Sequence, residues 1–415
     1  MSYIKKGFLG ISWLGGSRVF ARIISLASIA ILARILQPAQ FGIFGIATLV
    51  LSFLEIISET GINVFLIQEK QIKQYIDTAW VISIIRGICI FLIILLLSKP
   101  LSIFFTTPEV LILLRLISLL PLIKGFINPA ILNYQKNLFF NKEVYLRSGL
   151  FVISTAVTLI IALLTSSTTS LVWGLIAAAI IETIFSLIFI KPLPKLKLER
   201  KQTRLIIHRG KWMTLVGISN YLFHQGDDLI VSKFLGQKTL GFYQMAYKIS
   251  TLPITEVADI FGRVSFPIYT KISADKKRLR KAFIKTLGTI SILVLPLSAI
   301  IFFFSSQLIF FVLGPNWLDI VPIIKILAIF GAIRAISGSS SSVLLALKKQ
   351  REVSNITLIS LIGMMVAIFP LMNKFGIMGV AGATLVGSIT ALPLIIYYVR
   401  RELFSNLSQT NKNCL

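Results

Sequence analysis

The sequence predicts an all-α polytopic membrane protein, with about twelve transmembrane helices in two six-helix pseudo-repeats. Three observations carry this prediction: long apolar runs, an uneven distribution of Lys and Arg, and an internal repeat. Of the 415 residues, 56% are hydrophobic, which exceeds the share in an ordinary soluble domain. The apolar runs have roughly the length that crosses a bilayer. They occupy residues 8–35, 41–60, 78–98, 108–128, 143–164, 169–190, 212–235, 242–268, 281–304, 318–346, 353–372 and 377–399.

The connections between these runs alternate in charge. Most of the 42 Lys and Arg residues lie at the two ends of the chain and in the connections that follow every second run. The intervening connections are short or poor in cations, with only Lys99, Lys238 and Lys374. The positive-inside rule therefore predicts that both termini are cytoplasmic. The formal net charge of +26 follows from this topology, and we expect no nucleic-acid partner.

An internal repeat connects the two halves of the chain. The segment 33–44 returns as 232–243, with a cation, a leucine and a glycine kept at matching places. A second match pairs Lys124 with Arg334 in the same order. Transporters built from parallel repeats hold six helices of the same orientation in each half, and place their substrate site between the halves.

The repeat and the charge pattern together predict the domain organisation. We expect an N-terminal six-helix lobe at 1–190, a basic cytoplasmic linker at 191–211 and a C-terminal six-helix lobe at 212–400. A cytoplasmic tail follows at 401–415.

Cations inside the apolar runs predict a cationic cavity. Arg18 and Arg22 lie one helical turn apart, so they share a face of the first helix. A cation at the centre of a membrane helix costs about 2.5–3.5 kcal/mol on the translocon scale, so these side chains need a wet or anionic surrounding. Arg86, Arg263 and Arg334 also lie deep in their runs, whereas other cations near helix ends can extend to the interface.

Four acidic residues are candidates for ion coupling: Asp227, Asp228, Glu256 and Asp259. Asp227 and Asp228 are adjacent, so only one of them readily faces a cavity. Glu256 and Asp259 share a helix face with Arg263, and an internal ion-pair cluster explains that spacing as well as a proton or sodium site does.

The sequence lacks the usual marks of an enzyme. It contains two histidines, and shows no metal-ligand spacing, phosphate-binding glycine loop or nucleophile elbow. External connections such as 36–41, 165–170 and 236–241 are too short for a catalytic domain. We therefore expect a protein that is not an enzyme and needs no metal or cofactor.

Several motifs give the chain a family resemblance. The combined pattern resembles the Wzx-type polysaccharide flippases of the multidrug/oligosaccharidyl-lipid/polysaccharide superfamily, above all the branch with colanic and teichuronic acid exporters. The motifs are Ser12-Trp13-x-Gly15-Gly16-Ser17-Arg18, Leu32-Ala33-Arg34-x-Leu36-x-Pro38-x-x-Phe41-Gly42, Glu59-x-Gly61, Leu66-Ile67-Gln68, Asp227-Asp228, Leu240-Gly241-Phe242-Tyr243-Gln244-Met245-Ala246-Tyr247, Phe266-Pro267 and Leu313-Gly314-Pro315-Asn316-Trp317.

The resemblance implies a two-lobe bundle of the MATE and MurJ type in the bacterial inner membrane. It implies that the protein flips an undecaprenyl-pyrophosphate-linked oligosaccharide by alternating access, in exopolysaccharide, O-antigen or capsule biosynthesis. Arg18 and Arg22 would then meet the pyrophosphate, and Arg86, Arg263 or Arg334 would extend the basic lining. Membrane lipids, a polysaccharide polymerase and export machinery are the partners it implies.

Three alternatives stay open at the level of sequence. A cation-coupled multidrug exporter of the same superfamily should have a membrane interior dominated by acids, whereas here cations prevail. A membrane glycosyltransferase or polymerase should carry a large external loop with catalytic carboxylates. A peptidoglycan-precursor flippase would meet the same pyrophosphate.

Overall fold

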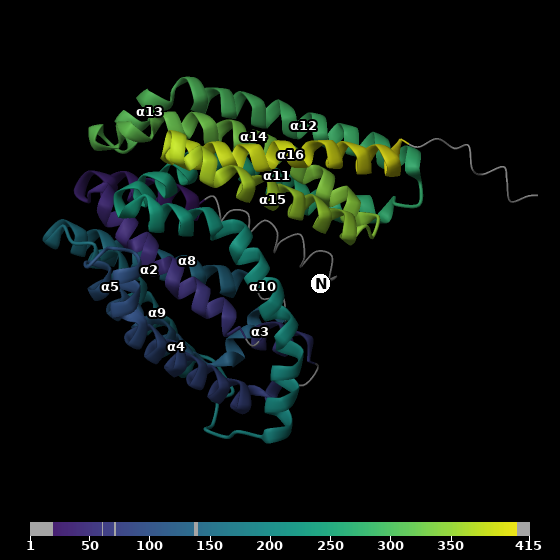
Figure 1. Ribbon diagram of the computed structural model, residues 1–415. Helices are drawn as coiled ribbons and strands as arrows, with labels where there is room; N and C mark the ends of the chain where they lie inside the picture. The colour runs from purple at the N-terminus through teal and green to yellow at the C-terminus, as the bar shows by residue number, and fades with distance from the viewer. Residues whose placement is uncertain (1–19, 60, 70–71, 137–139, 405–415) are drawn as a thin grey trace, which may run out of the picture. The chain divides into compact units, whose positions relative to one another are not determined.

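The computed structural model describes residues 20–59, 61–69, 72–136 and 140–404. Every regular element in these ranges is a helix, which confirms the predicted all-α class (Figure 1). The chain forms two compact units, and the division falls between Gly241 and Phe242. We call them the N-terminal unit and the C-terminal unit. The predicted lobe and linker boundaries stay a prediction.

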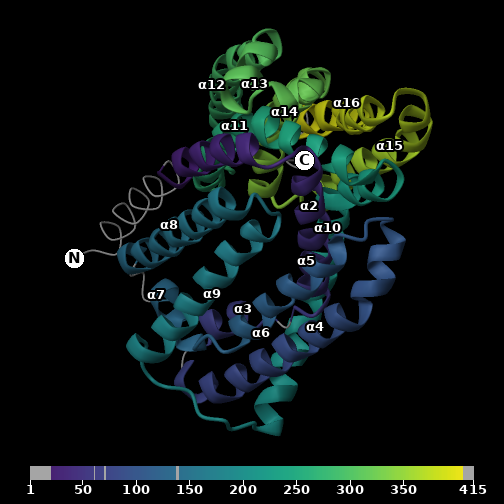
Figure 2. The ribbon, with the colours of Figure 1, turned by 90° about the vertical axis from the view of Figure 1, so that its left-hand side faces the viewer.

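The N-terminal unit begins, in its described part, with a helix at residues 20–35. The following elements are α2 (Pro38–Ile57), α3 (Ile62–Gln68), η1 (Ile72–Gln74), α4 (Ile76–Phe104), α5 (Val110–Ile117), α6 (Leu119–Gly125), η2 (Pro129–Leu132), α7 (Asn133–Lys136), α8 (Phe140–Thr165), α9 (Thr169–Phe189) and α10 (Arg200–Phe234). Helices α4 and α6 pack against each other, and so do α8 and α9 (Figure 2).

The C-terminal unit contains most of α11 (Gly236–Lys271), whose first turn belongs to the N-terminal unit. The remaining elements are α12 (Lys276–Phe303), α13 (Ser305–Val312), η3 (Pro315–Ile320), α14 (Val321–Ala346), α15 (Gln350–Phe375) and α16 (Ile377–Leu403). Helices α15 and α16 lie side by side (Figure 1). Gly314 has φ 96°, which only glycine adopts readily, and it turns the chain into η3. The buried Trp317 of η3 packs edge-on against Phe242 at 5.9 Å.

Eight helices of the described residues are long and apolar enough to cross a membrane: α2, α4, α8, α9, α12, α14, α15 and α16. A ninth span results if the bent segment Val110–Lys136 is counted, in which α5 and α6 turn by 73° into η2 and α7. Helices α10 and α11 have ample length and more polar residues. This set is consistent with the expected number of about twelve.

Local sequence explains where α2 begins. Pro38 occupies the first turn, where its missing N–H costs no hydrogen bond. The side chain of Gln40 accepts a hydrogen bond from the backbone N–H of Gln37 at 2.7 Å, which satisfies a donor at the helix start. The Gln40 amide also donates to the carbonyl of Ser166 at 2.9 Å, and so ties this end of α2 to the α8–α9 connection.

The two predicted repeat segments meet inside the N-terminal unit. A Cβ atom on Gly42 of α2 would lie 1.7 Å from the carbonyl oxygen of Gln237, and a Cβ on Gly241 would lie 2.0 Å from that of Pro38. The equivalent glycines therefore let the two backbones approach each other reciprocally. Small residues serve this purpose where helices cross within a membrane.

The segment after α9 is fastened to the N-terminal unit. The buried Asn128 donates through its side-chain amide to the carbonyls of Ile190 and Pro192, both at 3.0 Å. Farther on, the backbone N–H of Lys195 donates to the Asp77 carboxylate at 2.9 Å. Residues 191–199 thus lie along the start of α4 before α10 begins.

We expect Gly42→Ala to lower stability by about 1–3 kcal/mol, because the added methyl group meets backbone that has no rotamer to change. The measurement is the thermal midpoint of the purified protein in detergent. Gly149→Ala is the matched control, because a Cβ at Gly149 meets no atom within 4 Å. Equal midpoints for the two variants would contradict the close crossing.

Candidate functional site

A pocket of about 230 Å³ lies inside the N-terminal unit. Helices α2, α3, α4, α6, α8 and α9 contribute residues to its wall, together with η2. The wall combines aliphatic side chains with an unusual number of charges. These are Arg86, Lys124 and Arg147 as cations, and Glu55 and Glu182 as acids.

A close helix crossing forms one wall of this pocket. A Cβ atom on Gly87 of α4 would lie 2.4 Å from the carbonyl oxygen of Pro121, and one on Gly125 of α6 would lie 2.9 Å from that of Ser83. Both glycines line the pocket. The position of Arg86, next to Gly87, is therefore fixed by backbone packing between α4 and α6.

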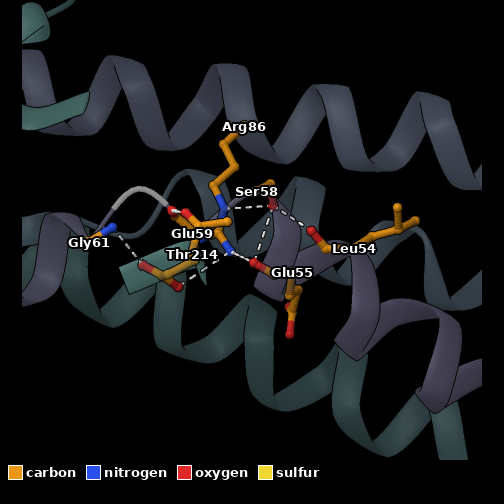
Figure 3. Close-up of polar contacts among 7 residues, drawn as sticks. All are labelled: Leu54, Glu55, Ser58, Glu59, Gly61, Arg86 and Thr214. Atoms are coloured by element: carbon orange, nitrogen blue, oxygen red, sulfur yellow. Dashed lines mark hydrogen bonds and ion pairs between the residues drawn. The ribbon is translucent and has the colours of Figure 1, made fainter. Parts of the chain in front are cut away.

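Arg86 binds the end of α2 (Figure 3). Its Nη2 donates to the carbonyl of Glu55 at 2.6 Å, and its Nε donates to the hydroxyl of Ser58 at 3.1 Å. Nη2 also lies 3.6 Å from the carboxylate of Glu59. The last carbonyls of a helix have no partner within the helix, so a guanidinium placed there satisfies them and matches the negative end of the dipole.

The same cluster sets the turn from α2 into α3. The backbone N–H of Gly61 donates to the Glu59 carboxylate at 3.0 Å, and Gly61 has φ 63°, which favours glycine. Thr214 of α10 donates to the carbonyl of Glu59 at 2.6 Å. The motif Glu59-x-Gly61 is thus a structural joint that holds α2, α3, α4 and α10 together (Figure 3).

A second ion-pair cluster lies on the α8 and α9 side of the pocket. Arg147 of α8 is 3.7 Å from the carboxylate of Glu182 on α9, and 3.8 Å from that of Glu143 one turn earlier. Gln135 donates to Glu143 at 2.6 Å. With 61% of its side chain exposed, Arg147 contributes little to stability through these pairs.

Two charged groups of the pocket have no polar partner among the described residues: the ammonium of Lys124 and the carboxylate of Glu55. The carbonyl of Glu55 faces Arg86, whereas its side chain points away from the guanidinium (Figure 3). Lys124 is exposed and Glu55 is half-buried. Both residues line the pocket.

The other predicted cations are described to different degrees. Arg18 lies outside the described residues, and Arg22 is half-buried in the helix at 20–35. Arg263 belongs to α11, but its side chain is outside the described part. Arg334 of α14 donates to the hydroxyl of Tyr247 at 2.7 Å, and its guanidinium lies 5.8 Å from the centre of the Phe330 ring.

The four predicted acids occupy two long helices. Asp227 of α10 is buried at 7% exposure and accepts a hydrogen bond from the backbone N–H of Asp228 at 3.0 Å. Asp228 is half-buried. In α11, Glu256 is half-buried and Asp259 is exposed. Asp227 and Asp228 belong to the N-terminal unit and are not among the residues that line its pocket.

Sequence reasoning missed the pairing of Arg147 with Glu182, because the two residues lie on different helices and no spacing connects them. It also missed that Lys124 and Glu55 share a pocket. Within the described part of the chain, no group of three or more His, Cys, Asp or Glu residues is arranged to hold a metal ion.

The fold and these sites define a multi-pass helical membrane protein with charged groups held between its helices. A family model described as "Polysaccharide biosynthesis protein" matches residues 31–322. The chain belongs to this family, which confirms the resemblance seen in its motifs.

Curated relatives agree with this assignment. An uncharacterized membrane protein in the cps region of Klebsiella pneumoniae is 27% identical, over 85% of this chain and 74% of the relative. The lipopolysaccharide biosynthesis protein WzxC of Escherichia coli K12 is 25% identical, over 83% and 71%. The teichuronic acid biosynthesis protein TuaB of Bacillus subtilis 168 is 26% identical, over 83% and 72%.

Solved structures share the fold. The lipid II flippase MurJ, in an inward closed conformation, matches with a TM-score of 0.73 and 16% identity, over 93% of this chain and 87% of that one. An inward-facing MATE family multidrug transporter matches with a TM-score of 0.70 and 13% identity, over 92% and 94%. Both likenesses concern the fold, and they confirm the predicted MATE and MurJ type.

We expect Arg86→Gln to loosen the joint between α2 and α3, because hydrogen bonds to a charged group contribute about 1.5–3 kcal/mol each and the partial exposure of Arg86 favours the lower end. Hydrogen exchange of the Ser58, Glu59 and Gly61 amides should accelerate about tenfold. Arg115→Gln on α5, an exposed arginine away from the joint, is the control. Unchanged exchange rates in Arg86→Gln would contradict the role of Arg86 in stabilising the connection between α2 and α3.

Proposed function

We propose that this protein is a flippase that moves an undecaprenyl-pyrophosphate-linked oligosaccharide across the bacterial inner membrane, for exopolysaccharide, O-antigen or capsule biosynthesis. The family match over residues 31–322 carries this proposal. Relatives named for lipopolysaccharide and teichuronic acid biosynthesis support the glycan, and the fold shared with a lipid II flippase supports the lipid-linked form.

The substrate has a doubly charged link between its lipid and its sugars, and cations inside helices suit that link. We assign contact with the pyrophosphate to Arg18 and Arg22, with Arg263 and Arg334 extending the basic lining. Among its contacts, the Arg334 side chain donates to the hydroxyl of Tyr247 and lies over the ring of Phe330. Arg86 belongs to the same predicted set, yet its contact with Glu59 reduces the charge that it offers to an anion.

Transport requires no covalent step in this proposal, so no enzymatic chemistry is part of it. The internal repeat supports alternating access. Asp227, Asp228, Glu256 and Asp259 stay the candidates for proton or sodium coupling, and Asp227 is favoured by its burial. A polysaccharide polymerase and export machinery would act on the flipped product.

The alternative is a cation-coupled multidrug exporter, whose fold the chain shares with a TM-score of 0.70. Cations prevail over acids inside the apolar runs as well, which favours an anionic substrate instead. A peptidoglycan-precursor flippase would use the same cations, and the test below separates it by its head group.

The basic connections also support a proposal for orientation, with both termini in the cytoplasm. We expect a green fluorescent protein fused after Leu415 to fluoresce in cells, and alkaline phosphatase fused at the same place to stay inactive. The reverse pair of signals would overturn the orientation and leave the flippase proposal intact.

The direct test is transbilayer movement of a fluorescent undecaprenyl-pyrophosphate oligosaccharide in vesicles that contain the purified protein. We expect the double variant Arg18→Ala/Arg22→Ala to move it at least about thirtyfold more slowly, because truncating one side of a buried, hydrogen-bonded charge contact costs about 2–5 kcal/mol. Arg115→Ala is the control, because this exposed arginine lies outside the proposed lining.

Three arms make the result decisive. Lipid II in place of the oligosaccharide identifies a peptidoglycan-precursor flippase, and a cationic dye identifies a drug exporter. Proton and sodium gradients, applied in turn to wild type and Asp227→Asn, identify the coupling ion. Movement that is equal in wild type and in the double arginine variant would reject the assignment of Arg18 and Arg22.

A further inference from the structure

We propose that the pocket of the N-terminal unit is a subsite for one neutral hexose ring of the transported glycan. This inference rests on the proposed function, because that function supplies the sugar. It concerns a different part of the substrate from the pyrophosphate. The pocket would form hydrogen bonds with the hydroxyl groups of the sugar, and so contribute to the specificity of the protein for its glycan.

The charge balance of the pocket argues against an anion as its ligand. Its wall holds three cations, Arg86, Lys124 and Arg147, and two acids. Glu59 lies 3.6 Å from Arg86, and Glu182 lies 3.7 Å from Arg147. A phosphate group would have to compete with these carboxylates and would meet their repulsion. A neutral ligand has no such conflict.

The two charges without a described polar partner suit a polyol. A sugar hydroxyl donates one hydrogen bond and accepts others, so it pairs with a carboxylate and with an ammonium at the same time. Glu55 offers the acceptor and Lys124 offers the donors. Asn63 of α3, also in the wall, adds an amide that does both. Hydrogen bonds to ionised groups are roughly twice as strong as those between neutral groups.

The size of the pocket matches a single ring. Its volume of about 230 Å³ lies below the range of about 300–1,000 Å³ typical for drug-sized ligands. One ring would lie with its faces against the aliphatic wall of Ile90, Ile127 and Ile131, and the rest of an oligosaccharide would extend out of the pocket.

Such a site would select among sugars through their hydroxyl groups. A pocket built to hydrogen-bond a hydroxyl strongly rejects an analogue that lacks it, because its own polar groups then remain unpaired. Glu55 and Lys124 come from α2 and α6, so the two contacts would hold a ring from two different helices. The axial or equatorial position of a hydroxyl then decides whether both contacts form.

The test measures occupancy of the pocket without any transport. Cys89 and Cys414 are replaced by serine, and Ile131→Cys places one thiol in the aliphatic wall, where it spares the polar groups. The rate of its reaction with N-ethylmaleimide is measured with glucose, galactose, mannose or sodium pyrophosphate at about 100 mM, because a single-ring contact has an affinity in the millimolar range. Thr165→Cys, an exposed position at the end of α8, is the control thiol.

We expect at least one of the three sugars to slow modification of Ile131→Cys by about threefold or more, as mass action requires for an occupied site, and to leave Thr165→Cys unchanged. Adding Glu55→Gln or Lys124→Gln should abolish this protection. Neither side chain has a polar partner in the described structure, so both variants should fold, which their thermal midpoints check. Glu109→Gln, an exposed carboxylate outside the pocket, should keep the protection.

Three results would overturn the inference: protection by pyrophosphate instead of sugar, no protection by any of the three sugars, or protection that survives both substitutions. The outcome is separate from that of the vesicle assay. Sugar protection in a protein that moves no lipid-linked glycan would keep the pocket and reject the flippase. Movement of the lipid-linked glycan without protection of the thiol by sugar would support the flippase and reject the sugar subsite.

Discussion

A charge inside a bilayer is costly unless it meets a partner or water, and the N-terminal unit is organised around this constraint at Arg86. Its guanidinium meets a helix-end carbonyl, a hydroxyl and the Glu59 carboxylate. The same contacts stabilise the C-terminal end of α2 and the turn into α3. Helix α3 supplies part of the pocket wall. The shape of the pocket therefore depends on the ion pair between Arg86 and Glu59, which offsets the free-energy cost of placing the arginine in the bilayer. Breaking it would expose the arginine and displace the wall together.

Backbone contact is the second element of this design. Helices in a membrane gain little from burying apolar surface against each other, so close van der Waals packing has to hold them. Gly42 and Gly241 allow it between the two repeat segments, and Gly87 and Gly125 allow it between α4 and α6. The second crossing fixes Arg86 on one side and Lys124 on the other, since each charge neighbours a glycine of the crossing. The close packing of the α4 and α6 backbones thus determines where Arg86 and Lys124 lie in the pocket.

The sequence was informative where the physics is local. The repeat is found by comparing two parts of the sequence directly, and apolar length predicts helices because it depends on neighbouring residues alone. A deep arginine such as Arg86 predicts a polar surrounding for the same reason. Which residue provides it could not be predicted: Glu59 and Ser58 reach Arg86 only through the packing of α2 on α4, and Arg147 meets Glu182 through that of α8 on α9. These partners follow from tertiary structure, and no spacing in the sequence encodes them.

A lipid-linked glycan, as in the proposed function, joins a charged link to neutral sugars, and the two parts demand different sites. Binding the charge needs an excess of cations, whereas recognising hydroxyl groups needs donors and acceptors in balance. The arginines assigned to the pyrophosphate, among them Arg334, are proposed for the first demand, and the mixed wall around Glu55 and Lys124 fits the second. Because these groups occupy different elements, the sugar contacts can change without altering the cations. A common scaffold can then carry different glycans on the same charged link.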